Sequence, residues 1–267
     1  MRARLALAFF FLAVLLCAGG RAAGTLYQKL EGSFDPTGEP MQVRLVHRGR
    51  SGCEPGCPEW ISAEGMMVQG SAQQFGIVVN SLRGQKIPVF IHSHGGLVIE
   101  AMLIGKLIRA RGLNVVVSRT DFEPCPNPSE GCKTKAKSTL GHPSSEPADC
   151  FSACLFILAG GVHRLTAPRV QLGITSFRFP ESQIAIWRKD YGGKLPLDDF
   201  IRLELIPERK ALIARYFAEM GVAAEITEIM YSAPSADIQM LNDSELTQLK
   251  LVTDLNAGQS LLEQLLK

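Results

Sequence analysis

The chain has 267 residues, of which 46% are hydrophobic, and its formal net charge is +2 at pH 7. That length suffices for one large α/β domain or two small ones, with a core that does not depend on disulfides for stability. The balanced charge predicts no nucleic-acid partner, because nucleic acids are bound by strongly basic surfaces.

The first 23 residues have the pattern of a secretory signal peptide. Arg2 and Arg4 precede an apolar run at residues 5–17 that is too short to cross a bilayer, and small residues follow, so that cleavage after Ala22 fits. We therefore expect a periplasmic or secreted protein with no membrane segment after cleavage. An uncleaved N-terminal anchor is the alternative.

Six of the seven cysteines lie beyond this segment. An even number in an exported chain favours disulfides. The spacing suggests three local pairs, Cys53–Cys57, Cys125–Cys132 and Cys150–Cys154. A metal site is the competing interpretation, but no C-x-x-C pair occurs and no histidine lies at ligand spacing beside a cysteine pair. We therefore predict disulfides, no metal site and no cofactor.

The first half of the mature chain predicts a parallel sheet. Alternating or continuous apolar residues indicate strands, and apolar residues at helical spacing indicate helices. A strand, two glycines, a helix and a second strand follow one another within about 30 residues, as in a βαβ unit. The predicted strands are 41–47, 60–67, 87–91 and 113–117, and the predicted helices are 71–82 and 97–111.

The second half begins with residues 120–149, which are rich in Pro, Ser, Lys and Cys. Their composition predicts one long irregular segment, which in a compact domain is typically a lid or a binding loop. Helices then dominate, which predicts a helical C-terminal portion. The predicted elements are helices at 151–158, 204–220, 223–231 and from 244, and strands at 170–174 and 238–241.

Two segments could carry chemistry. Residues 91–98 place Gly95 and Gly96 between a buried strand and a helix, where backbone N–H groups can form a nest for an oxyanion; a plain tight turn is the alternative. Ser152 begins an apolar helix between Cys150 and Cys154. A serine at that position is a candidate nucleophile, although it is also a common helix N-cap.

Together these segments resemble the Clp-type proteases of the ClpP/crotonase superfamily. Residues 91–96 are similar to the Asn-Ser-Pro-Gly-Gly segment of that family, residues 152–168 to its nucleophile helix and the next strand, and residues 237–254 to its acid-bearing strand and closing helix. The resemblance extends from about Trp60 to Asp254. The most similar group is that of the exported bacterial ClpP-like proteins with extra cysteines.

The resemblance implies an α/β fold of repeated ββα units with a helical C-terminal portion, at residues 60–255. A signal peptide at 1–23 and a leader with a disulfide-stapled loop at 24–59 would precede it, and a tail at 256–267 would follow. It also implies a homo-oligomer and a peptide or protein ligand. Three functions stay open: an impaired homologue that binds, an active peptidase, and acyl-thioester chemistry, which an exported chain makes the least expected.

The resemblance also implies roles for individual residues. Ser152 would be the nucleophile, the amides of Gly96 and Ala153 would form the oxyanion hole with Gly95 beside them, and Asp237 would be the acid, although its match is offset by one residue.

The family's histidine is expected at the end of the strand 170–174, where this chain has Thr175. Threonine cannot serve as a general base, so the sequence predicts a weak or inactive serine peptidase homologue. The alternative is an active periplasmic serine hydrolase with an unusual base. His94, beside the glycine pair, is the candidate substitute, unless it is simply a polar residue at a strand end.

Overall fold

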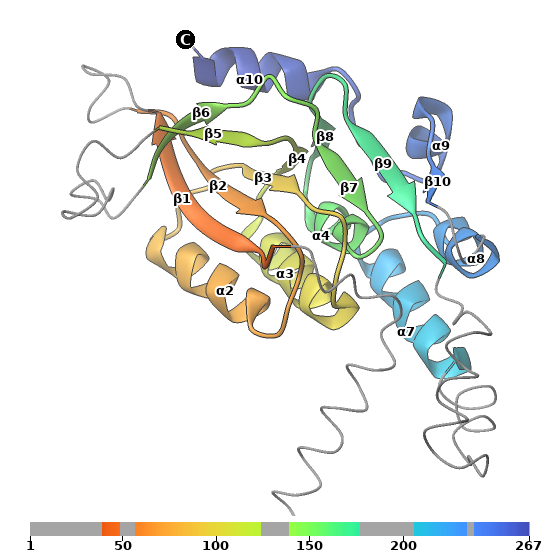
Figure 1. Cartoon of the computed structure of the whole chain (residues 1–267). Helices are drawn as coiled ribbons and strands as arrows, with labels where there is room; N and C mark the ends of the chain where they lie inside the picture. The colour runs from red at the N-terminus through yellow and green to blue at the C-terminus, as the bar shows by residue number, and fades with distance from the viewer. Residues whose placement is uncertain (1–38, 49–56, 124–138, 177–205, 234–237, 267) are drawn as a thin grey trace, which may run out of the picture. The chain divides into compact units, whose positions relative to one another are not determined.

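The computed structural model describes five stretches of the chain, namely residues 39–48, 57–123, 139–176, 206–233 and 238–266. All of them lie in the second of the chain's two compact units, residues 35–267. This unit combines curved sheets with helices (Figure 1), so the predicted α/β fold class is confirmed. Among the described residues, no helix has both the length and the apolar character needed to span a bilayer.

The larger sheet has seven strands in the order β5-β6-β1-β2-β3-β4-β8. Strands β2, β3, β4 and β8 are parallel to one another, as the predicted βαβ unit requires. Strand β1 is antiparallel to β2 and parallel to β6, and β5 is antiparallel to β6. The bounds are β1 Gln42–Arg48, β2 Glu59–Glu64, β3 Val89–His92, β4 Val115–Val117, β5 Thr120–Phe122, β6 Thr139–Pro143 and β8 Arg164–Thr166.

The smaller sheet has three strands, in the order β10-β9-β7. Strand β7 (Asp149–Phe151) is parallel to β9 (Gln171–Ile174), which is antiparallel to β10 (Gln239–Met240). A parallel bridge between Ser93, just after β3, and Cys150 in β7 connects the two sheets. The carboxyl ends of β3, β7 and β9 therefore lie close together.

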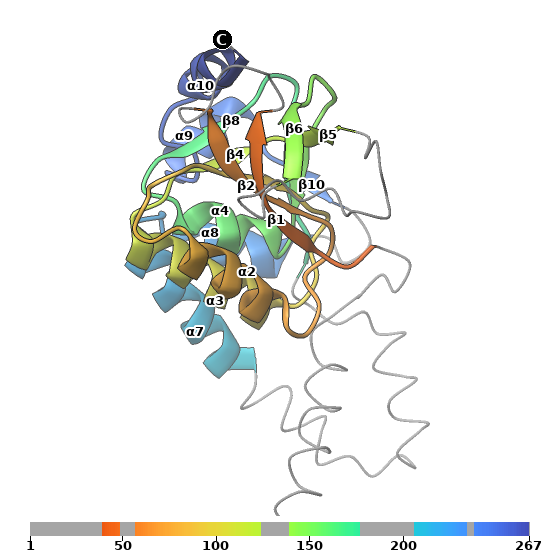
Figure 2. The ribbon, with the colours of Figure 1, turned by 90° about the vertical axis from the view of Figure 1, so that its left-hand side faces the viewer.

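Both faces of the larger sheet are buried. Ile61 of β2 faces the main core with helices α2 (Ser71–Ser81) and α3 (Val98–Arg111), whereas the adjacent Trp60 faces a second core with helix α10 (Ala257–Leu266). Figure 2 shows α10 and the α2–α3 pair on opposite sides of the sheet. Strands buried on both faces consist of continuous apolar residues, which explains the pattern of β3 and β4.

Helix α4 (Cys154–Gly160) is buried along its whole length. Helix α4 lies against α3 so closely that a Cβ on Gly160 would be 2.4 Å from the carbonyl oxygen of Gly105. The hydroxyl of Tyr216, in α7 (Ile206–Glu219), donates to the carbonyl oxygen of Phe156 in α4 at 2.6 Å. Helices α8 (Glu225–Ser232) and α9 (Asp243–Gln248) follow, as the predicted helical C-terminal portion requires.

The prediction of one irregular segment from 120 to 149 is wrong at both ends, where β5, β6 and the start of β7 form. Thr120 explains why the sequence did not predict β5, because the hydrogen-bonding partners of Thr120 are polar groups distant in the chain. Its Oγ1 accepts from the Trp60 indole at 3.0 Å, and its N–H donates to the Glu64 carboxylate at 2.7 Å. No local pattern of apolar residues encodes such contacts.

Candidate active site

The candidate site lies where three strands end. His92 is the last residue of β3, and Gly95 and Gly96 follow it; Ser152 follows β7, and Thr175 follows β9. The parallel pairing of β7 with β9, and the bridge from the end of β3 to β7, bring these residues to one edge. Ligand sites are common at the carboxyl ends of parallel strands.

The glycine pair is required by conformation and by space. Gly95 and Gly96 have φ of +119° and +124°, a region that side chains rarely adopt. A Cβ on Gly95 would lie 3.0 Å from the Cβ of Ser152, and a Cβ on Gly96 would lie 2.3 Å from the carbonyl oxygen of Met67. The Ser93 hydroxyl also fixes the turn, since it accepts from the N–H of Gly95 at 3.2 Å.

Ser152 has a backbone conformation that is uncommon for a residue other than glycine. Its φ is +55°, in the left-handed region, where such residues often mark functional sites. Its N–H donates to the carbonyl oxygen of Gly173 at 3.0 Å. The N-cap of α4 is Ala153, with no side-chain capping bond. The interpretation of Ser152 as a helix N-cap therefore does not describe this turn.

The Ser152 side chain meets Thr175. Thr175 Oγ1 donates a hydrogen bond to Ser152 Oγ at 2.7 Å, and both residues are half-buried. Sequence comparison with the Clp-type pattern placed Thr175 where a histidine is expected. In the structure this residue is the hydrogen-bonding neighbour of the serine.

Two backbone amides near Ser152 are available for a ligand. Within the described part of the chain, no hydrogen bond is formed by the N–H groups of Gly96 and Ala153. Buried or half-buried N–H groups are usually paired in proteins. Two unpaired N–H groups near a serine can donate hydrogen bonds to an oxyanion or to a carbonyl oxygen.

The predicted Cys150–Cys154 disulfide is confirmed and brackets Ser152. Both cysteines are fully buried, which fits a structural role. Cys57 is also disulfide-bonded. The cysteines at 53, 125 and 132 and the proposed acid Asp237 lie outside the described residues.

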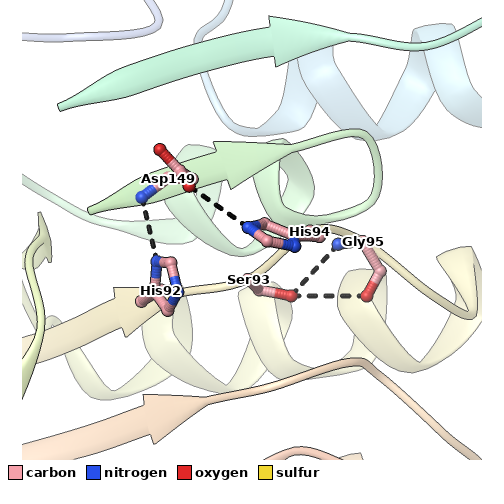
Figure 3. Close-up of polar contacts among 5 residues, drawn as sticks. All are labelled: His92, Ser93, His94, Gly95 and Asp149. Carbon is pink, nitrogen blue, oxygen red and sulfur yellow. Dashed lines mark hydrogen bonds and ion pairs between the residues drawn. The ribbon is translucent and has the colours of Figure 1, made fainter. Parts of the chain in front are cut away.

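Two histidines and an aspartate form a polar cluster beside the glycine pair (Figure 3). His94 Nε2 lies 3.2 Å from Asp149 Oδ2, and the His92 Nδ1 accepts from the backbone N–H of Asp149 at 2.9 Å. The His94 ring also stacks on Phe151, with centroids 5.5 Å apart. Burial, and secondarily the nearby Arg119, lowers the pKa of His92 below its ordinary value. His92 is therefore neutral at neutral pH.

Sequence reasoning did not identify Asp149 as a site residue. Its only sequence signal is that an acidic side chain directly precedes Cys150. The contact with His94 spans 55 residues and depends on the bridge between the end of β3 and β7. Spacing along the chain does not reveal it.

Comparison with known proteins gives matches only among solved structures, since neither a protein-family profile nor a curated protein matches the chain. ClpP1 from Listeria monocytogenes is 18% identical, with a TM-score of 0.41 over 71% of this chain and 86% of that one. A serine-to-alanine mutant of the membrane-bound stomatin-specific protease 1510-N is 13% identical, with a TM-score of 0.44 over 76% and 81%. An asparagine-to-aspartate mutant of the Listeria protein is 18% identical, with a TM-score of 0.42 over 73% and 90%.

Proposed function

We propose that the chain is an exported ClpP-like protein whose serine-hydrolase-like site lacks a base, and that it acts by binding a peptide or protein rather than by efficient hydrolysis. The hydrogen bond from Thr175 to Ser152 carries this proposal. A serine hydroxyl becomes a strong nucleophile only when a neighbour takes its proton. Here the Thr175 hydroxyl donates to the serine oxygen. A threonine hydroxyl is too weak a base to remove the serine proton, whichever of the two hydroxyls donates.

The loss of rate that a missing base causes is large enough to favour binding over hydrolysis. Loss of the base in a Ser-His-Asp triad costs several orders of magnitude in rate, and only oxyanion stabilisation and binding persist. The unpaired N–H groups of Gly96 and Ala153 would supply both. A site with these groups and no base can therefore hold a carbonyl or carboxylate oxygen of a ligand without cleaving it efficiently.

An active serine hydrolase is the second candidate, and the His94–Asp149 pair is the observation that favours it. A carboxylate 3.2 Å from an imidazole nitrogen orients the ring, as the aspartate of a Ser-His-Asp triad does. In the described residues, however, no hydrogen bond joins His94 to Ser152. A substrate would have to draw the two side chains together.

A fluorophosphonate probe tests the proposal, because it labels only activated serines. We would treat the oxidised mature protein, Ser152→Ala, Thr175→His and the double variant Thr175→His/Ser152→Ala, and check each fold by circular dichroism. We expect no labelling of the wild type, and labelling of Thr175→His that disappears in the double variant.

Other outcomes have definite meanings. Labelling of the wild type that is lost in Ser152→Ala would contradict the impaired site, and its loss in His94→Gln would then identify the base. A folded Thr175→His variant that is not labelled would contradict a hydrolase-like arrangement around Ser152.

A further inference from the structure

The cluster of His92, His94 and Asp149 has a composition that serves as a metal site in other proteins. The two histidines are separated by one residue in an extended segment, and alternate residues of such a segment point to the same side. Figure 3 shows both imidazole rings directed toward Asp149 at the start of β7. One potential ligand atom from each of the three residues lies within 4.8 Å of the other two.

The distances suit a tetrahedral zinc ion. Zinc bonds of about 2.0–2.1 Å to nitrogen and oxygen place two ligand atoms about 3.3 Å apart. The separation of His94 Nε2 and Asp149 Oδ2 is already 3.2 Å. The separations of the His92 ligand atom from these two atoms are each at most 4.8 Å, so a side-chain shift of roughly 1.5 Å or less brings His92 to a bonding position.

We propose that His92, His94 and Asp149 bind a zinc ion, with water as the fourth ligand. Two imidazoles and one carboxylate form a ligand set found in zinc enzymes with an open position. The ion would join the end of β3 to the start of β7, the two segments that lead into Gly95 and Ser152. The prediction of no metal site rested on the cysteines, and this proposal departs from it on a set of ligands that includes Asp149, which is distant from the histidines in sequence.

The hydrogen bonds of the cluster show what zinc binding would require. His92 is half-buried, and a histidine ligand must offer an unprotonated ring nitrogen. Its Nδ1 accepts from the backbone N–H of Asp149, so coordination through Nε2 requires that this bond give way and a proton relocate on the ring. The cation would replace the His94–Asp149 contact with two stronger bonds. The positive charge of Arg119, near His92, would oppose the binding of a cation.

The proposal does not depend on the role of Ser152, because zinc binding is measured without any substrate. Isothermal titration of the tag-free, chelator-treated, oxidised protein with zinc chloride tests it. Oxidation removes thiolates as competing ligands, and a free-thiol assay verifies this. We expect saturable binding of one zinc ion per chain and a zinc-dependent rise in melting temperature.

Substitution of each ligand should weaken binding at least about tenfold, in His92→Gln, His94→Gln and Asp149→Asn. His142→Gln is the matched control, since His142 also lies near a carboxylate, at 3.6 Å from Asp121, and is similarly exposed. Its affinity should equal that of the wild type. Melting curves without metal would show that each variant folds.

Cobalt(II) absorption of the wild-type protein is a second measurement that needs no variant. A visible spectrum typical of tetrahedral cobalt with nitrogen and oxygen ligands, displaced by stoichiometric zinc, is expected. The proposal would be overturned by the absence of saturable binding, by affinity that survives all three substitutions, or by an equal loss in His142→Gln.

Discussion

At the residue scale, the turn at Gly96 shows how little room the site leaves. We predict that Gly96→Ala lowers the free energy of unfolding by about 2–4 kcal/mol, because a Cβ would meet the backbone of Met67 at 2.3 Å and φ is +124°. Gly84→Ala is the control, since Gly84 has φ +93° but nothing within 4 Å. It should cost only about 1 kcal/mol. Urea unfolding of both variants measures the difference, and equal losses would show that contact with Met67 is not limiting.

Some residues of the site could be predicted from the sequence, and others could not. The glycine pair and Ser152 stand out, because a Gly-Gly after an apolar strand and a serine before an apolar helix are local patterns. The resemblance to Clp-type proteases placed Thr175 in the same site, and it lies 2.7 Å from the serine oxygen. The link between His94 and Asp149 was missed, because it depends on how two strands pair.

At the element scale, Tyr216 connects α7 to α4 and should make stability depend on alkaline pH. Burial raises the pKa of its hydroxyl well above the ordinary value of 10.0, so the folded chain keeps a proton that the unfolded chain loses above about pH 10. The folded state then binds more protons, and the free energy of unfolding falls as pH rises. Below pH 10 this contribution is fully present.

The test is urea unfolding of the wild type and Tyr216→Phe at pH 7 and from pH 9 to 11. At pH 7 the variant should lose about 1 kcal/mol, because the hydrogen bond to the Phe156 carbonyl disappears. Its loss of stability from pH 9 to 11 should be smaller than that of the wild type. A residual slope is expected from Tyr231, whose pKa burial also raises. Identical slopes in the two proteins would contradict the assignment to Tyr216.

Elements with strong periodicity were predicted well. The apolar run at 87–91 became β3, and the predicted helix 97–111 became α3, which ends at Gly112 with φ +64° as a glycine stop should. Strands β5 and β6 were missed, because each is short and carries few apolar residues. Pairing with distant strands, not local composition, determines them.

At the scale of the whole described unit, the sheet is stable only if both faces are covered. Helix α10 covers the second face, although the sequence predicted residues 256–267 to be a tail. Leu262 and Leu265 are 7% and 8% exposed and belong to a core with Trp60 and Phe90. Helix α10 follows α9 in the chain, yet it packs against β6 and β8, and its core cluster also includes residues of β2 and β3. The local sequence of α10 does not predict contacts with strands so distant in the chain.

We therefore predict that α10 is required for a stable fold. Leu262→Ala should lower the free energy of unfolding by about 2–3 kcal/mol, since it removes buried methyl groups next to the sheet. Gln264→Ala, at an exposed position of the same helix, should change it by less than about 0.5 kcal/mol. Truncation after Asn256 should expose Trp60 and Phe90 and increase the binding of a hydrophobic dye. Urea unfolding and dye fluorescence measure these effects; a truncated chain as stable as the full one would mean that the second face of the sheet needs no cover.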